Sequence, residues 1–152
     1  MDMQTFIDNQ MKARRADVLA KSDQLTLGEM ILKMEAILAK TPERNSELLV
    51  WYDFEYLFPN KIDSWRGSYS ELALNFAGHS DADGKPLNSK QFHELLTNAV
   101  GAIFTGYKGG DFIMSKHTPV WVSNYGNAAN TAVIDIIDAG YKVVIMTAYR
   151  EY

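Results

Sequence analysis

The sequence predicts an α+β fold in which N-terminal helices and a central helix pack on a mainly antiparallel β-sheet. Apolar residues recur at helical spacing over residues 3–20, 26–40 and 88–103, and at every second position over residues 47–58. Two more strand-like stretches follow one another near residue 140 without a helix between them. Because helices and strands occupy separate parts of the chain, an α+β fold is favoured over a parallel α/β sheet.

Composition restricts the classes of protein. At 152 residues, the chain is expected to form a single domain, residues 1–152, with a hydrophobic core. A net charge of −4 without a basic block argues against long duplex nucleic acid as a partner. The absence of cysteine excludes disulfides, zinc thiolates and a thiol nucleophile. No apolar run approaches the length of a membrane span, and the first ten residues lack a signal-peptide pattern, so we expect a cytosolic protein without membrane contact.

Two helices are predicted before residue 42. Residues 3–20 form a moderately amphipathic pattern with charges between the apolar positions. In the second helix, Thr26 and Glu29 have the spacing of a capping box, in which each side chain bonds the other residue's backbone amide. Thr41 and Pro42 are expected to end this helix, since the residue before proline avoids the helical region.

A third helix is predicted to begin at a second capping pair, Asn88 and Gln91. Its pattern extends into a glycine-rich stretch that starts near residue 104. The apolar face of this helix is expected to comprise Phe92, Leu95, Leu96, Ala99 and Ile103.

The strand predictions rest on a change of period from 3.6 to two. Residues 47–58 alternate as one long strand, and residues 72–76 resemble a second strand that would pair with it as a hairpin. Residues 131–137 and 141–149 also have strand composition. Asp138–Gly140 between them is expected to be a three-residue hairpin loop, with the glycine at a positive φ.

The stretch from Phe104 to Gly126 is the leading candidate for a binding site. Its glycines surround Tyr107 and Lys108, Phe112 follows, and a strand-like run ends at Ser123. Glycines allow close approach of the backbone to a ligand, and the aromatic and cationic side chains suit a planar base with a phosphate. The alternative is a helix end, a bend and a buried strand. A P-loop is not favoured, because no serine or threonine follows the lysine and we expect no strand before it.

Arginine offers the second signal for anion binding. Arg66 lies between Trp65 and Gly67, and a guanidinium can hold a phosphate through two parallel hydrogen bonds. The alternative is an ion pair of Arg66 with Asp63 or Glu71. Arg150 is a second candidate, although an arginine in such a position is commonly solvated.

Evidence for an enzyme is weaker. Asp53 and Glu55 would share one strand face, as catalytic carboxylates can, but such pairs are often solvated. His79, His93 and His117 lack a metal-binding spacing, and we predict neither a metal site nor a cofactor. The loop with Asp81 and Asp83 lacks the glutamate of a calcium loop. A cyclic-nucleotide hydrolase and a protein-interaction module that inhibits a host defence protein remain as alternatives.

Three segments carry a resemblance to a known family: LTLGEMILKME (25–35), SWRGSYSELAL (64–74) and GYKGGDFIMSKHTPVWVSNYG (106–126). In these segments the chain resembles the first family of phage Thoeris anti-defence proteins. The resemblance implies a viral protein, in the cytoplasm of the infected bacterium, that sequesters cyclic ADP-ribose isomers such as glycocyclic ADP-ribose without cleaving them. It also implies a possible second site for cyclic di- or trinucleotides, and a homo-oligomer, dimer or hexamer, with pockets at subunit contacts.

The resemblance also suggests site residues. Phe112 and Asn124 match positions that contact the ligand in this family, whereas residues 1–22 lie outside the similar region. We expect stacking on a base by Phe112 or Tyr107, and diphosphate contacts from the cationic candidates. The complete set of candidate ligand-binding residues is Trp65, Arg66, Tyr69, Tyr107, Lys108, Phe112, Thr118, Asn124 and Arg150.

Overall fold

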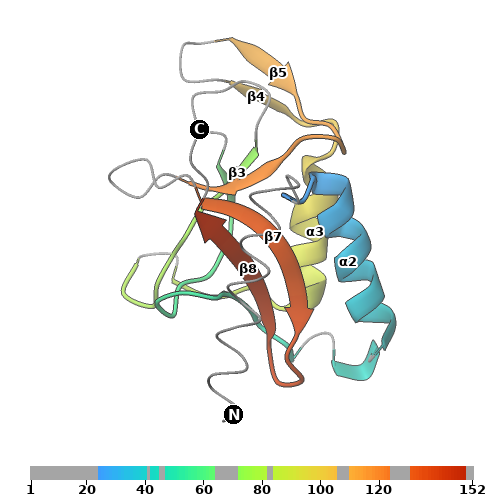
Figure 1. Cartoon of the computed structure of the whole chain (residues 1–152), viewed down its shortest axis with the longest axis vertical. Coiled ribbons are helices and arrows are strands. Elements are labelled where there is room, and N and C mark those ends of the chain that lie inside the picture. Colours follow the sequence, from blue (N-terminus) through green and yellow to red (C-terminus); the bar gives the residue numbers. More distant parts are fainter. Residues whose placement is uncertain are drawn as a thin grey trace.

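The computed structural model describes residues 24–40, 42–44, 47–63, 72–81, 84–105, 110–123 and 131–149 (Figure 1). The predicted helix over residues 3–20 lies outside these ranges. The described helices are α2 (Leu27–Lys40), a 3₁₀ turn (Pro42–Arg44) and α3 (Ser89–Ala99). The strands are β1 (Val50–Tyr52), β2 (Ile62–Asp63), β3 (Leu72–Leu74), β4 (Ile103–Thr105), β5 (Asp111–Ile113), β6 (Val120–Val122), β7 (Thr131–Asp138) and β8 (Val143–Tyr149).

The main sheet has six strands in the order β1-β8-β7-β6-β3-β2. β1 is parallel to β8 and β3 is parallel to β6, while the remaining neighbours are antiparallel. The α+β class is therefore confirmed, but the prediction of a mainly antiparallel sheet is wrong, because the sheet is mixed. Both parallel pairs join segments far apart in the chain, for example Val50 with Val143, and local periodicity contains no information about such partners.

Four strands of the sheet point the same way. β6 and β8 are each antiparallel to β7, so they share a direction, and β3 and β1 run parallel to them. The carboxyl ends of β1, β3, β6 and β8 consequently lie toward one end of the sheet. This end is where the candidate site forms.

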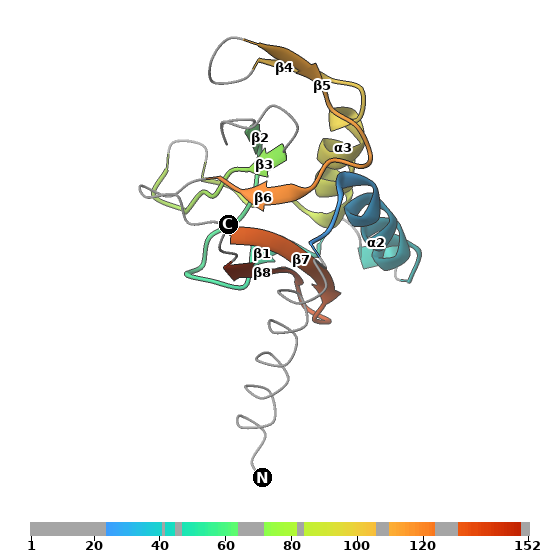
Figure 2. The same cartoon turned by 45° about the horizontal axis from the view of Figure 1, so that its top comes forward.

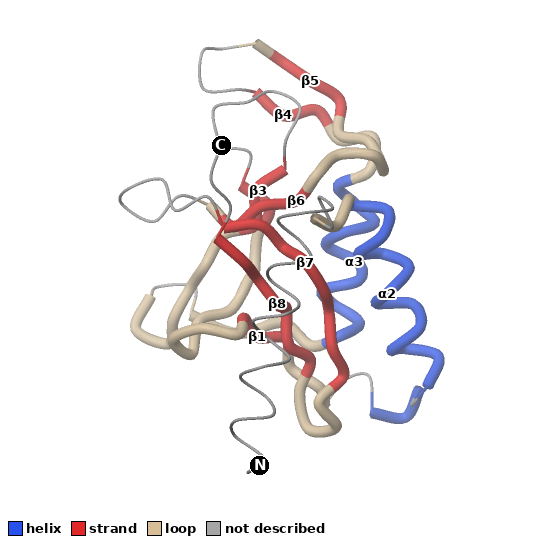
Figure 3. Tube along the Cα trace, viewed as in Figure 1, coloured by secondary structure: helices blue, strands red, loops and turns tan. Residues whose placement is uncertain are grey.

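Helices α2 and α3 lie side by side against one face of the sheet (Figures 2 and 3). Lys33 on α2 forms an ion pair of 3.0 Å with Asp135 on β7, which adds a polar link to this packing. Alternate strand residues point to opposite faces, and the opposite face carries a second, smaller cluster around Trp121 and Ile134. The main core between helices and sheet includes Met30, Met34, Phe92, Leu96, Val120, Val133 and Ile145.

Both predicted capping boxes are confirmed. In α2, the Glu29 amide donates to Thr26 Oγ1 (3.2 Å) and the Thr26 amide donates to Glu29 Oε1 (3.1 Å). In α3, Asn88 and Gln91 make the same reciprocal pair. However, α3 ends at Ala99 rather than Ile103, because Gly101 adopts a φ of +81° that helical residues do not.

The end of the predicted third helix is instead a strand. Ile103 begins β4, which pairs with β5 as a separate two-stranded hairpin, with Phe104 opposite Phe112. A strand therefore does lead into the glycine-rich segment, contrary to the prediction. The next described element is β5 rather than a helix, so the strand–loop–helix order of a P-loop is still not present.

The predicted long strand over residues 47–58 is also corrected. β1 contains only Val50–Tyr52, since Glu55 and Tyr56 both have positive φ and reverse the chain. The expected hairpin with residues 72–76 forms only further along, where β2 pairs with β3 and Phe58 bridges Ala77. By contrast, the hairpin of β7 and β8 is confirmed, and Gly140 has the expected positive φ, +91°.

Tyr52 links β1 to the segment after β3 through a buried phenol. Its hydroxyl donates to the Asn75 carbonyl oxygen over 2.6 Å, and burial raises the pKa of this phenol well above its usual value near 10. In the unfolded chain the same phenol ionises near pH 10. The folded state therefore retains a proton that the unfolded state loses above that pH.

We expect this difference to destabilise the protein in alkali. The stabilisation is fully present below pH 10 and is lost as pH rises above 10, at up to about 1.4 kcal/mol per pH unit. Urea unfolding at pH 9, 10 and 11 should show a shallower decline for Tyr52→Phe than for the wild type. Tyr141→Phe is the control, because that side chain is 73% exposed. Equal declines for all three proteins would contradict this role of Tyr52.

Candidate functional site

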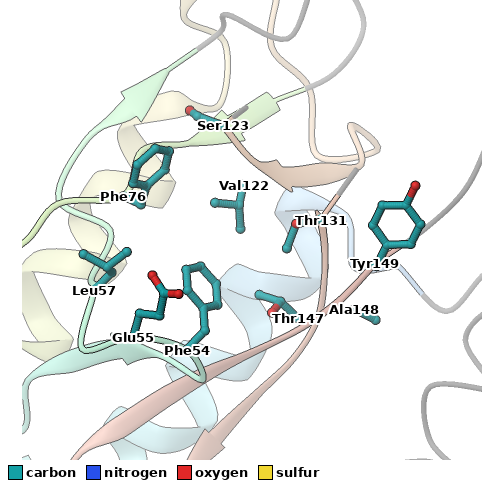
Figure 4. A pocket seen from close by; sticks show the side chains of 10 residues that line it. All are labelled: Phe54, Glu55, Leu57, Phe76, Val122, Ser123, Thr131, Thr147, Ala148 and Tyr149. Atoms are coloured by element: carbon teal, nitrogen blue, oxygen red, sulfur yellow. The ribbon is translucent and has the colours of Figure 1, made fainter. Parts of the chain in front are cut away.

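A pocket of about 350 Å³ opens where the carboxyl ends of the parallel strands meet (Figure 4). Its walls come from five segments: the turn after β1, the segment after β3, the end of β6, the start of β7 and the end of β8. This volume falls in the usual range for small-molecule sites. The lining residues are Phe54, Glu55, Leu57, Phe76, Val122, Ser123, Thr131, Thr147, Ala148 and Tyr149.

Strand alternation places the pocket on the helix-covered face of the sheet. Val122 lies on the same face as the core residue Val120, and Thr131 and Thr147 lie on the same face as Val133 and Ile145. In Figure 4, Val122 and Thr131 point into the space between the strands and the turn. The pocket is therefore an extension of the hydrophobic core that reaches the surface.

The turn over Phe54–Leu57 forms one wall. The Leu57 amide donates to the Phe54 carbonyl (3.3 Å), and the Tyr52 amide donates to the Leu57 carbonyl (2.9 Å). Glu55 and Tyr56 occupy its two central positions with φ of +48° and +53°, as in a type I′ turn. Such turns favour Asn-Gly, and each non-glycine residue in this region costs about 1–2 kcal/mol. Strain of this kind occurs preferentially at functional sites.

Aromatic packing fixes the Phe54 side chain. Its ring stacks on Tyr52 with centroids 4.9 Å apart and an interplanar angle of 11°. Tyr52 is itself held by its hydrogen bond to Asn75. Phe54 and Phe76 both line the pocket and come from different segments (Figure 4). The two rings provide apolar surface suited to a planar ligand.

Asp53 fastens this turn to β8. Its carboxylate accepts hydrogen bonds from the Thr147 amide (3.0 Å) and the Thr147 hydroxyl (2.7 Å), and its own amide donates to the Ile145 carbonyl (3.1 Å). Asp53 therefore has a structural role at the base of the pocket. It does not share a strand face with Glu55, which lies in the turn, so the predicted pairing of the two carboxylates is wrong.

The pocket has few polar groups: the Glu55 carboxylate only accepts hydrogen bonds when ionised, whereas the hydroxyl groups both donate and accept. Glu55 is exposed, and no hydrogen bond or ion pair within the described part of the chain engages its carboxylate. Ser123 and Thr131 add hydroxyl groups. No lysine or arginine occurs among the described residues of the lining. The pocket is therefore suited to an apolar ring that carries N–H or O–H donors.

Of the predicted site residues, Thr118 and Phe112 fall within the described ranges. Thr118 is only 7% exposed, and its hydroxyl accepts from the Ser115 amide (3.3 Å), while its carbonyl accepts from the Leu27 amide at the start of α2 (2.9 Å). It thus shapes the turn that receives α2. Phe112 lies at the centre of β5. Thr118 is not among the residues that line the pocket.

The other predicted residues lie outside the described ranges: Trp65, Arg66, Tyr69, Tyr107, Lys108, Asn124 and Arg150. Two of them are sequence neighbours of the pocket. Asn124 directly follows Ser123, and Arg150 directly follows Tyr149. The predicted segment and the pocket therefore meet at the end of β6.

Sequence reasoning missed most of the lining, including Phe54, Phe76, Thr131 and Tyr149. Each was assigned to a strand, and nothing in a strand pattern tells which strand ends converge. The alternating pattern continues through Glu55 and Tyr56 to Phe58, so no sequence signal marks the turn between them. A short loop hidden in an apparently regular strand is a frequent source of site residues.

The alternative metal sites receive no support from the described residues. No group of three or more histidine, aspartate or glutamate side chains gathers within the described ranges. His79 packs on Trp51 and Phe58, with ring centroids 5.7 and 5.6 Å away. Asp81 accepts a hydrogen bond of 2.7 Å from the Gly78 amide in its own loop.

Fold and pocket define an α+β protein with a mixed sheet and an aromatic pocket at its strand ends. No protein-family model, curated protein or solved structure matches the chain. Neither helix of the described part is long and apolar enough to cross a membrane.

Proposed function

We propose that the protein binds a cyclic nucleotide immune signal, such as a cyclic ADP-ribose isomer, and sequesters it intact as a phage anti-defence protein. The supporting observation is the pocket of about 350 Å³, which lies at the end of β6 and is lined by the rings of Phe54 and Phe76. The segment with the longest family resemblance, residues 106–126, contributes Val122 and Ser123 to this pocket. The resemblance and the geometry thus point to the same end of the sheet.

In this proposal the ligand contacts both the pocket and the predicted residues around it. The aromatic rings pack on the base, and Asn124 supplies a polar contact beside Ser123. Arg150, next to Tyr149, meets the diphosphate, as do Arg66 and Lys108. Base stacking contributes about 1–3 kcal/mol per base, and nanomolar binding requires about −12 kcal/mol, so several contacts must act together.

One experiment distinguishes this function from the two alternatives. The protein is incubated with a cyclic ADP-ribose isomer, separated from free ligand and heated, and the released compound is identified by mass spectrometry. Intact ligand supports sequestration. A cleaved product supports a cyclic-nucleotide hydrolase. The absence of any retained compound rejects sequestration and leaves a module that binds a host protein.

Phe112→Ala and Asn124→Ala are each expected to weaken binding by about 1–3 kcal/mol, or roughly ten- to a hundredfold. The first change removes a stacking surface and the second removes a polar contact. Calorimetric titration measures the affinity, and thermal melts show whether each variant remains folded. A folded Phe112→Ala protein with wild-type affinity would remove Phe112 from the site.

We also expect a homo-oligomer, and the hairpin of β4 and β5 is the surface proposed for the contact. Ile103 and Ile113 face each other across this hairpin and are 69% and 70% exposed. Exposed apolar pairs on a short hairpin with open edges are typical of interaction surfaces.

Light scattering at micromolar concentration should therefore report a dimer or hexamer for the wild type. Ile113→Lys should lower the mass toward that of the monomer, because burial of the new charge in the contact is unfavourable. Leu32→Lys provides a control on α2, where the side chain is 67% exposed. A wild-type monomer, or an equal effect of both changes, would contradict this assignment.

A further inference from the structure

We propose that the ligand enters the pocket base first, and that the Glu55 carboxylate accepts a hydrogen bond from an amino group on that base. This inference rests on the proposed function in taking the ligand to be a nucleotide. Beyond the proposed function, it states which part of the ligand the pocket holds and which residue selects that part.

Charge determines the orientation. The described lining has one carboxylate, that of Glu55, and no lysine or arginine. A carboxylate repels a phosphate and, when ionised, only accepts hydrogen bonds. A diphosphate inside this pocket would place like charges together in a mainly apolar space. The base is the uncharged part of the ligand and is therefore the part expected between Phe54 and Phe76.

The position of Glu55 makes it available for this contact. Figure 4 shows its carboxylate beside the Phe54 ring and directed toward the pocket. Glu55 has a φ of +48°, and its turn is closed by the hydrogen bond from the Leu57 amide to the Phe54 carbonyl. A base packed against Phe54 would therefore present its edge to Glu55. An exocyclic amine on that edge satisfies the carboxylate, whereas an edge without a donor leaves it desolvated.

The class of ligand follows from the chemistry of an acceptor-only group. Glu55 favours bases with an amino group, such as adenine, and disfavours rings that offer only acceptors. Ser123 and Thr131 can donate or accept and do not discriminate in this way. Glu55 is accordingly the specificity-determining residue of the pocket.

Adenosine and purine riboside form a matched pair of probes, because they differ only in the 6-amino group and neither carries a phosphate. NMR titration of the wild type should show that both shift the methyl signals of Leu57 and Val122. Adenosine should bind about tenfold more tightly, since a hydrogen bond to a charged group is lost with purine riboside. Glu55→Gln should reduce this preference to about threefold or less. Glu94→Gln, an exposed change on α3, should retain it.

The outcomes separate this inference from the proposed function. Equal preference for adenosine in the wild type and in folded Glu55→Gln would overturn the role of Glu55. Adenosine that binds without shifting Leu57 or Val122 would overturn the pocket assignment, even if the cyclic ADP-ribose isomer is retained intact. If the cyclic compound is not retained, but adenosine binds in the pocket with Glu55-dependent preference, the pocket assignment holds and the sequestration function fails.

Discussion

Replacing Asp53 with alanine is expected to destabilise the protein by about 3 kcal/mol. The change removes the acceptor for both the amide and the hydroxyl of Thr147, a residue that is buried on the central strand pair. Hydrogen bonds to a charged group contribute about 1.5–3 kcal/mol each, and a buried amide left without a partner adds a desolvation penalty. Urea unfolding at neutral pH measures the loss.

Two matched variants test this explanation. Asp53→Asn keeps an acceptor for the Thr147 amide and offers its amino group to the hydroxyl, so the expected loss is about 1 kcal/mol. Asp138→Ala removes a carboxylate that bonds the Gly140 amide in an exposed turn, and should cost about 0.5 kcal/mol. If Asp53→Ala destabilises no more than Asp138→Ala, the link between the turn and β8 does not stabilise the fold.

The second large effect is expected for Gly84→Ala, with a loss of about 3 kcal/mol. A Cβ atom at this position would lie 2.3 Å from the Gly78 carbonyl oxygen and 2.8 Å from the Asp81 carbonyl oxygen. Both obstacles are backbone atoms, and the Gly84 amide also donates to the Asp81 carbonyl. The loop must therefore move, and overpacking of this kind typically costs 1–3 kcal/mol or somewhat more.

Gly140→Ala separates crowding from backbone conformation. Nothing lies within 4 Å of a Cβ at Gly140, but its φ is +91°. Alanine there should cost only about 1–2 kcal/mol, the usual penalty for this region. Thermal and urea unfolding of both variants give the comparison. A smaller loss for Gly84→Ala than for Gly140→Ala would show that the loop over residues 78–84 adapts without difficulty.

Local features of the fold could be predicted from the sequence, because their causes lie within a few residues. The capping boxes at Thr26 and Asn88 depend on side chains three positions apart, and both are present. The turn at Gly140 depends on one residue that tolerates a positive φ. Periodicity also located β7 and β8 correctly to within about two residues.

Longer-range features could not be predicted in the same way. The alternation over residues 47–58 gave no sign of the turn at Glu55 and Tyr56, since neither residue favours a positive φ. Pairing of Val50 with Val143 depends on the whole fold, and so does the sheet order. The pocket combines five segments, and the sequence indicated only the one that ends at Ser123. Seven of the nine predicted ligand contacts, Arg150 among them, lie outside the described residues and stay predictions.

The position of β8 in the sheet also has a consequence for how the protein folds. β8 lies between β1 and β7, so β1 has no strand partner until β8 has been synthesised. At about 5–20 residues per second, a ribosome needs on the order of ten seconds to pass from Val50 to Val143. During that interval β1 has an open edge, and the walls of the pocket have not met. Folding of this sheet should therefore be slow and dominated by contacts distant in sequence. Binding capacity would appear only when β8 inserts, which makes the pocket one of the last features of the protein to form.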